Sequence, residues 1–379
     1  MVSLARLMTA VVLGTLLGAC AAPVTPPQKT ALAPEHAALR PAHWSDLPGW
    51  HDDNQARALV AFRASCRVLK KQPRWRRVCE LAASVDDNDS TAARSFFRRN
   101  FEPWQLATSA GSVTGLITGY YVPQMYGSRQ RSERFRYPLY APPPDLLRID
   151  LADVYPALRH YRLRGRLDGQ RVVPYYSRGE IDSAGAPLKG NELLWLDDPV
   201  AVFFLHVQGS GRITLQDGSS VMLNYADQNG HPYRSIGKVL LKRGLMRKEQ
   251  MSLAGIIAWG KAHPQQMQAL LNENPSYIFF RILPDADTMP PGAQGVALTP
   301  RRSLAVDTRV IALGTPVFLA TTWPNSDKPL QRLMVAQDKG GAITGQVRAD
   351  FFWGLGDKAG QLAGSMKQRG RMWLLLPRQ

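Results

Sequence analysis

Apolar side chains near the start of the globular part of the chain recur at three- and four-residue steps, the spacing of one buried helix face. Asp52 and Asp53 stand directly before this run, where an acidic side chain can cap a helix. We therefore predict a helix over 54–71, a second over about 75–85, and a third over about 90–100 capped by Asp89 or Ser90. The apolar positions of the first helix are Ala56, Leu59, Val60, Phe62, Cys66 and Leu69.

From residue 113 onward the pattern changes to short apolar runs separated by Gly, Asp and Asn turns, which is typical of strands. A helical pattern returns between residues 235 and 273 and gives way to strands again. We expect a mainly β protein with attached helices. The predicted strands are 113–122, 171–176, 200–207, 211–215, 220–224, 277–282, 302–306, 315–321, 331–337 and 371–376, and the predicted helices are 235–244, 252–262, 264–273 and about 356–364.

Residues 1–19 resemble a secretory leader, because Arg6 precedes an apolar run that is short for a membrane span. The leader ends in Leu-Gly-Ala before Cys20, the order of a lipoprotein processing site, so we predict acylation of Cys20. An ordinary signal peptide that happens to contain Cys20 is the alternative. Ala21, in place of Asp, favours the outer membrane by general lipoprotein behaviour, and Pro- and Ala-rich residues 20–41 then form a tether.

The formal net charge is +17, spread in local clusters. Such a charge attracts polyanions, here peptidoglycan carboxylates or anionic lipid, unless it reflects only the general basicity of a proteome. Nucleic acid is not expected, because an exported lipoprotein rarely meets it and no nucleic-acid motif is present. The histidines form no metal-ligand pair and no nucleotide loop occurs, so no metal and no cofactor are predicted.

Cys66 and Cys79 are the cysteines that remain after Cys20. They lie on two successive predicted helices, and an exported protein can oxidise them. A disulfide joining the helices and two buried free thiols are both compatible with the sequence.

Three aspartates in the last fifth of the chain carry the candidate chemistry. Burial in apolar surroundings raises a carboxyl pKa, and a raised pKa suits a general acid near neutral pH. Asp350 precedes Phe351 and Phe352, whose rings desolvate a carboxyl and stack on sugars. Asp350 is accordingly a candidate proton donor, or else a cap for the helix that follows.

Asp338 follows an apolar strand and begins Asp-Lys-Gly-Gly. It is interpreted either as a second carboxylate that sets the pKa of the first, or as a turn aspartate bonded to its own backbone. Gly340 and Gly341 suggest positive φ or close approach of a ligand. Asp307 is a groove residue or the first residue of a turn. An aspartic protease is disfavoured, because Asp307-Thr-Arg lacks the glycine that a second such element needs.

Taken together, these segments resemble one family, the membrane-bound lytic transglycosylase A type of murein lyases. The resemblance covers most of the chain after the tether, with long motifs in order. They are Thr118-Gly119-Tyr120-Tyr121, Arg178-Gly179-Glu180-Ile181-Asp182, Leu196-Asp197-Asp198-Pro199 through Gln208-Gly209-Ser210-Gly211, Tyr225-Ala226, Asn229 through Gly237, Asn274-Pro275-Ser276-Tyr277, and the aspartates Asp307, Asp338 and Asp350 of a three-aspartate module at about 298–376.

The resemblance implies a fold. A double-psi β-barrel with attached helices would comprise residues 42–124 and 284–379. A second, smaller β-rich domain over 125–283 would be inserted into it, with a glycan-binding groove between the two.

The resemblance also implies roles. Asp350 is the expected general acid/base and Asp338 its supporting carboxylate. The expected product is a 1,6-anhydro-muramic acid, formed by a carbon–oxygen lyase of the exotransglycosylase class, although the sequence itself does not indicate where on a strand cleavage starts. The residues expected to hold the sugars are Thr118, Gly119, Tyr120, Gln208, Asp307, Gly340 and Gly341.

The expected location is the outer membrane, with the protein anchored through Cys20 and facing the periplasm. The expected partners are peptidoglycan strands and, beyond them, cell-wall synthases or scaffold proteins. The alternative is a non-catalytic, peptidoglycan-binding scaffold lipoprotein, because fold alone does not fix function.

Overall fold

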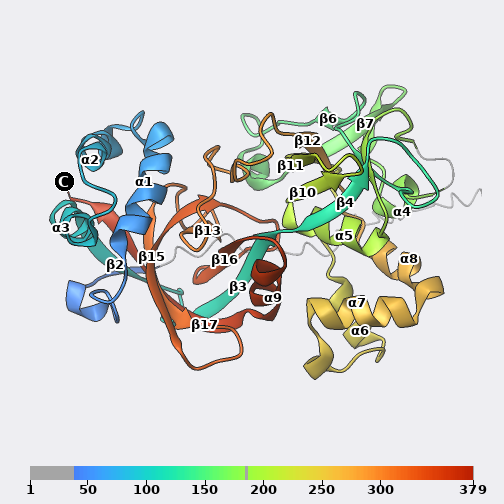
Figure 1. Ribbon diagram of the computed structural model, residues 1–379. Coiled ribbons are helices and arrows are strands. Elements are labelled where there is room, and N and C mark those ends of the chain that lie inside the picture. Colours follow the sequence, from blue (N-terminus) through green and yellow to red (C-terminus); the bar gives the residue numbers. More distant parts are fainter. Residues whose placement is uncertain (1–37, 184–186, 379) are drawn as a thin grey trace, which may run out of the picture. The chain divides into compact units, whose positions relative to one another are not determined.

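A computed structural model of the chain describes residues 38–183 and 187–378 (Figure 1). The predicted leader, Cys20 and most of the predicted tether lie outside these residues. Within the described ranges, none of the helices has both the length and the apolar character needed to cross a membrane.

Three helices precede the first long strand, as predicted. Asp89 caps the third, its carboxylate accepting hydrogen bonds from two backbone N–H groups of the first turn. Cys66 and Cys79 form a disulfide between the first two helices, with Cα atoms 5.4 Å apart, so the structure selects one of the two states that the sequence left open. The helices are α1 (Gln55–Leu69), α2 (Pro73–Ala83) and α3 (Ser90–Asn100).

The predicted capping role of Asp52 and Asp53 is wrong. Asn54 occupies the N-cap of α1 and makes no side-chain cap bond. Asp53 is buried instead, and each of its oxygens pairs with Arg302 at 2.8 Å. It also accepts the Leu333 N–H at 2.7 Å. A buried guanidinium requires a carboxylate partner, and this requirement outweighs the contribution of a helix cap at Asp53.

Six strands close into a barrel, because the last strand pairs with strands on both sides of the ring (Figure 1). Two neighbouring pairs are parallel, β13 with β15 and β16 with β3, and the other four are antiparallel. Outside the ring, β2 (Phe101–Ala107) pairs with the last strand and β1 (Ala38–Pro41) with β2. The ring consists of β3 (Gly115–Val122), β13 (Ser303–Val306), β14 (Pro316–Thr322), β15 (Pro329–Asp338), β16 (Arg348–Leu355) and β17 (Lys367–Pro377).

Strands β13, β14, β15 and β16 are buried along most of their length, which is why their sequences contain long apolar runs. Helix α9 (Asp357–Ser365) packs on β3 and β16, close to its predicted place. A Cβ atom at Gly119 would lie 2.7 Å from Trp353 Nε1 and 2.9 Å from the Ala363 Cα atom. Only glycine at position 119 therefore allows β3 to approach Trp353 and α9 this closely.

Between β3 and β13 the chain forms two further sheets. The larger has the strand order β12-β11-β10-β4-β9-β5 and the smaller the order β6-β7-β8. Their strands are β4 (Gln124–Ser128), β5 (Tyr137–Tyr140), β6 (Leu147–Arg148), β7 (Arg164–Asp168), β8 (Arg171–Pro174), β9 (Glu192–Leu196), β10 (Ser210–Leu215), β11 (Ser220–Gln228) and β12 (Ile278–Ile282). The helices of this region are α4 (Arg178–Ile181), α5 (Pro199–Gln208), α6 (Ile236–Lys242), α7 (Leu253–Ala262) and α8 (Pro264–Asn272), and the short 3-10 turns of the chain are Trp44–Asp46, Pro156–His160 and Lys248–Gln250.

The predicted strand at 200–207 is wrong, because this run is helix α5. Asp198 caps it by accepting the Val200 N–H at 2.8 Å, Pro199 begins its first turn, and Gly209 ends it with φ 77°. These are strong helix boundary signals. The apolar run masked them, because α5 is buried on several sides and shows no polar stripe.

Candidate functional site

Strand pairing brings three of the predicted site residues into one row. Ala305 on β13 pairs with Asp338 on β15 and with Asp350 on β16. Asp350 pairs in turn with Thr118 on β3. Side chains of directly paired residues extend to the same face of a sheet. A register shift interrupts the β13–β15 pairing between Leu304 and Ala305, next to Asp338. The two carboxyl groups are nevertheless close enough for the negative charge of Asp338 to raise the pKa of Asp350.

Asp350 is held by a short relay of hydrogen bonds. Thr118 Oγ1 donates to Asp350 Oδ1 at 2.5 Å, and Arg348 Nη2 donates to Thr118 Oγ1 at 2.8 Å. Burial raises the pKa of Asp350 to about 6, and the negative charge of Asp338 adds to the rise; the Thr118 hydrogen bond and the Arg348 charge act in the opposite direction. A carboxyl group with this pKa is substantially protonated at mildly acidic pH and can act as a general acid.

The alternative role of Asp350 as a helix cap is wrong. Asp350 lies inside β16 with strands paired on both sides. Helix α9 begins at Asp357, and Gly356 occupies its N-cap.

Asp338 ends β15 and accepts two backbone N–H groups on one oxygen. The donors are Ala293 at 2.8 Å and Lys339 at 2.9 Å. The bond from Lys339 confirms the local turn contact, and the bond from Ala293 attaches a distant loop. Burial raises the pKa of Asp338, and these hydrogen bonds oppose the rise.

Tyr120 is buried beside the two carboxyl groups. Its ring packs on Phe352 with centroids 5.1 Å apart. Burial, followed by the negative charges of Asp338 and Asp350, raises the pKa of its phenol well above the ordinary value. The phenol therefore stays protonated and can only act as a neutral hydroxyl near these carboxylates.

Gln208 links α5 to the site strand. Its Oε1 atom accepts the Tyr121 N–H at 3.1 Å, three residues along β3 from Thr118. Gly119, by contrast, faces Trp353 and α9, so its lack of a side chain is explained by packing.

Asp307 belongs to a different set of contacts. Arg309 binds both of its oxygens, at 2.9 and 2.6 Å, and the Gly345 N–H donates to Oδ2 at 2.9 Å. Burial alone would raise the pKa of Asp307, but these hydrogen bonds outweigh burial and leave the pKa below its ordinary value. The turn interpretation is confirmed, because the backbone N–H groups of Val310 and Ile311 donate to the Asp307 carbonyl.

Gly340 and Gly341 lie in the loop that Gly345 fastens to Asp307. Neither is among the glycines with positive φ, so that part of the prediction is wrong. A Cβ atom added at Gly340 would lie 2.8 Å from the Ile343 side chain. A Cβ atom added at Gly341 would have no heavy atom of a non-adjacent residue within 4 Å. The backbone at Gly341 is thus open to approach.

Comparison with known proteins agrees with these features. The chain matches the MltA specific insert domain over residues 116–281 and the 3D domain over residues 302–376. It is 36% identical to membrane-bound lytic murein transglycosylase A of Escherichia coli K12 over 74% of this chain and 71% of that protein. The chain belongs to the membrane-bound lytic murein transglycosylase A family.

Solved structures of this MltA family share the fold. MltA from Neisseria gonorrhoeae is 38% identical, with a TM-score of 0.77 over 90% of this chain and 92% of that one. A crystal structure of E. coli MltA with bound chitohexaose is 30% identical, with a TM-score of 0.64 over 92% of this chain and 94% of that one. The mainly β architecture with attached helices is therefore the MltA fold, and the resemblance inferred from the motifs is confirmed.

Both matched segments of the MltA family contribute to the site. Thr118 and Gln208 fall in the insert-domain match, and Asp338 and Asp350 in the 3D match. Arg348, whose guanidinium donates to Thr118, was not among the site residues predicted from the sequence. The sequence signal was its spacing. Residues two apart on a strand lie on the same face, so this spacing places Arg348 on the face of Asp350. Among the described residues, no group of three or more His, Cys, Asp and Glu side chains is arranged to hold a metal.

Proposed function

We propose that this MltA family member is a lytic transglycosylase of peptidoglycan. It cleaves the β-1,4 bond between N-acetylmuramic acid and N-acetylglucosamine and leaves a 1,6-anhydro-N-acetylmuramic acid end. The observation that carries the proposal is the carboxyl group of Asp350, with its pKa raised to about 6, in one row with Asp338 and Thr118.

The reaction needs one group that first gives and then takes a proton. Protonated Asp350 donates to the bridging oxygen, and an oxocarbenium-like state develops at C1 of the muramic acid. The resulting carboxylate removes the proton from the C6 hydroxyl, whose oxygen bonds to C1. Because Thr118 donates to Oδ1, the transferred proton belongs on Oδ2 of Asp350.

One catalytic carboxyl group suffices for this chemistry. A hydrolase needs a second carboxylate to activate water or to attack the sugar. In the lyase the nucleophile is part of the substrate and is already close to C1. Asp338, fixed by Ala293 and Lys339, then contributes its negative charge, which favours the protonated form of Asp350.

The finer fold assignment belongs to the same proposal. The closed six-stranded ring with two parallel pairs supports a double-psi β-barrel formed by 42–124 and 284–379. The two extra sheets support an inserted domain over 125–283. A glycan groove would lie between them. The E. coli relative has a crystal structure with bound chitohexaose, which supports glycan binding.

The residues proposed to hold the sugars differ in how well they suit that role. Thr118, Tyr120 and Gln208 lie at or beside the row of carboxyl groups. Gly119 could contribute only its backbone, and Gly340 and Gly341 an open loop edge. Asp307 would act indirectly, by fastening that loop through Gly345.

The protein is proposed to act at the periplasmic face of the outer membrane, anchored by acylated Cys20. The relatives are named membrane-bound, which supports membrane association. Cell-wall synthases or scaffold proteins are proposed as partners.

Digestion of purified murein tests the proposed reaction. The lipid-free protein should release muropeptides lighter by one water than hydrolytic products, and the Asp350→Asn variant should release none. Reducing ends in place of anhydro ends would identify a hydrolase. Binding to sedimented murein without any release by the wild type would identify a non-catalytic scaffold.

A further inference from the structure

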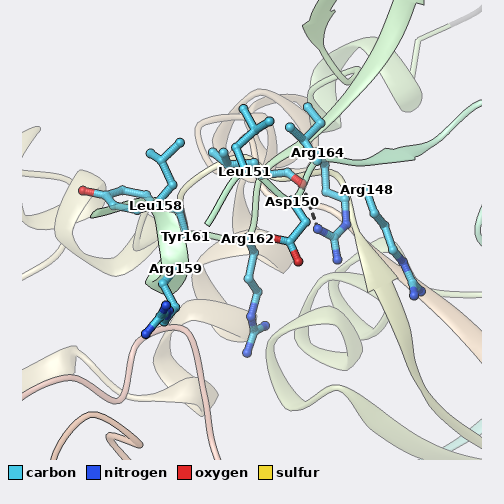
Figure 2. A pocket seen from close by; sticks show the side chains of 10 residues that line it. Arg148, Asp150, Leu151, Leu158, Arg159, Tyr161, Arg162 and Arg164 are labelled. Carbon is cyan, nitrogen blue, oxygen red and sulfur yellow. Dashed lines mark hydrogen bonds between the residues drawn. The ribbon is translucent and has the colours of Figure 1, made fainter. Parts of the chain in front are cut away.

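A pocket of about 280 Å³ lies where β6 leads into the segment before β7. Figure 2 shows the side chains of Arg159 and Arg162 extending in the same direction, with the guanidinium of Arg164 and the carboxylate of Asp150 nearby. We call this site the arginine pocket. Its lining residues are Arg148, Ile149, Asp150, Leu151, Leu158, Arg159, Tyr161, Arg162, Leu163 and Arg164.

The arginine pocket holds more positive than negative charge. Arg148 and Arg164 share one buried carboxylate, Asp227, at 2.6 and 2.8 Å. Arg159 and Arg162 make no ion pair with any residue that the structure describes. Asp150 is the one acidic side chain in the lining. With Asp227 already matched, the surplus of guanidinium groups favours an anionic ligand.

The volume and the lining residues of the pocket limit the size and the chemical type of that ligand. Pockets for drug-sized ligands begin at roughly 300 Å³, so this one suits a small charged end group better than a saccharide chain. The planar guanidinium fork matches a carboxylate in two parallel hydrogen bonds. Leu151, Leu158 and Tyr161 add apolar surface for a short aliphatic stem.

One residue of the arginine pocket, Arg162, has its charge near the segment that follows Asp338. The Arg162 guanidinium lies 5.9 Å from the ring centroid of Tyr225. It is also close enough to Lys339 that its charge, after burial, lowers the Lys339 pKa. Lys339 follows Asp338 directly and donates its backbone N–H to that carboxylate. A molecule that reaches the carboxyl row could therefore also place an anionic group in the pocket.

We propose that the arginine pocket binds a carboxylate of the peptide carried by the muramic acid of the bound strand. The proposal rests on the proposed function, because it assigns a part of the same substrate to this site. It makes the protein selective for peptide-bearing strands over strands from which the peptides have been removed.

The test compares two substrates: murein strands with their peptides, and the same strands after enzymatic removal of the peptides. Arg159→Gln and Arg162→Gln, singly and together, should raise KM on peptide-bearing strands by about tenfold more than on peptide-free strands. Arg98→Gln is the control for charge, because Arg98 is an exposed arginine of α3 outside the pocket. It should change KM equally on both substrates.

A binding experiment separates recognition from chemistry. Isothermal titration calorimetry of the Asp350→Asn variant with the two kinds of strand should show tighter binding of peptide-bearing strands. The double variant Asp350→Asn, Arg159→Gln should bind both kinds of strand with equal affinity. Because Arg159 is exposed, this variant should fold. An equal loss of affinity for both kinds of strand, or no loss of affinity for either, would overturn the pocket assignment. Absence of anhydro product from wild-type protein on both strands would instead refute the proposed function.

Discussion

Asp350 and Asp307 each have a nearby arginine in the sequence, but the pKa of Asp350 is raised and that of Asp307 is lowered. Each has an arginine two residues away, Arg348 before Asp350 and Arg309 after Asp307. Arg309 gives its donors to Asp307 itself and, with the Gly345 N–H, lowers the Asp307 pKa. Arg348 gives its donors to Thr118 and to backbone carbonyl groups, so Asp350 keeps a pKa raised to about 6.

The difference teaches that an arginine near an aspartate in sequence does not set its pKa. The carboxylate or other acceptor that receives the guanidinium N–H groups makes the difference. For Arg309 the turn after β13 brings the guanidinium to Asp307, and for Arg348 the pairing of β16 with β3 supplies Thr118. Where the arginine binds the carboxylate, the aspartate is a structural anion. Where the arginine is diverted, burial dominates and the aspartate can exchange protons.

The largest expected effect is the loss of activity in Asp350→Asn. Removing the only group proposed to transfer the proton should lower anhydro-product formation by about a thousandfold or more. Asp307→Asn should lower activity per folded molecule far less, and mainly through a higher KM, because Asp307 acts only by fastening the loop through Gly345. Mass spectrometry of muropeptides, at equal concentrations of folded protein, measures both. Comparable losses in the two variants would erase the distinction between the two aspartates.

The same pair of variants should change stability in opposite directions. The Asp350 pKa is raised, so its stabilising protonation is complete below about pH 4 and lost as pH rises through about 6. Asp350→Asn should therefore raise the free energy of unfolding at pH 7.5 by about 1–3 kcal/mol, with no gain near pH 4.

The Asp307 pKa is lowered, so its contribution is present at neutral pH and lost as pH falls below the ordinary value. Asp307→Asn should lower the free energy of unfolding at pH 7.5 by about 1–3 kcal/mol, because a buried ionic hydrogen-bond acceptor is removed. Denaturant unfolding at the two pH values checks both signs. Destabilisation by Asp350→Asn at pH 7.5 would contradict the raised pKa.

A smaller effect concerns the pH profile. Because Asp350 must be protonated to start the reaction, kcat/KM should fall as pH rises through about 6. Asp338→Asn should move this limb to lower pH, and Arg348→Gln should move it to higher pH, each by less than about one unit. Initial rates between pH 4 and 8 measure the shifts. If the limb moved in the same direction in both variants, Asp338 and Arg348 would not have opposite effects on the Asp350 pKa.

The smallest effect is expected at Gly341, in the loop that Asp307 fastens. Gly341→Ala should leave the free energy of unfolding within about 0.5 kcal/mol, because a Cβ atom there meets nothing within 4 Å. If the glycan approaches this backbone, KM should rise while Tm stays constant. An unchanged KM would restrict the sugar contacts to the β3 side of the site.

Much of the local structure followed from the sequence. The helices α1, α2 and α3 showed clear apolar periodicity, and Asp89 was a recognisable cap. The apolar run that ends at Asp338 identified β15. Helix α5 was misassigned because burial on several sides removes the polar stripe that distinguishes a helix from a strand.

The sequence by itself determined the candidate carboxyl groups, the helices α1, α2 and α3 and the family, because each depends on neighbouring residues or on motifs in order. Tertiary structure decided which aspartates act together. Thr118 is far from Asp338 and Asp350 in the chain, and the three residues meet only because β13, β15, β16 and β3 lie side by side. Tertiary structure also fixed the pKa of each aspartate, since desolvation and hydrogen bonding depend on groups that distant strands supply.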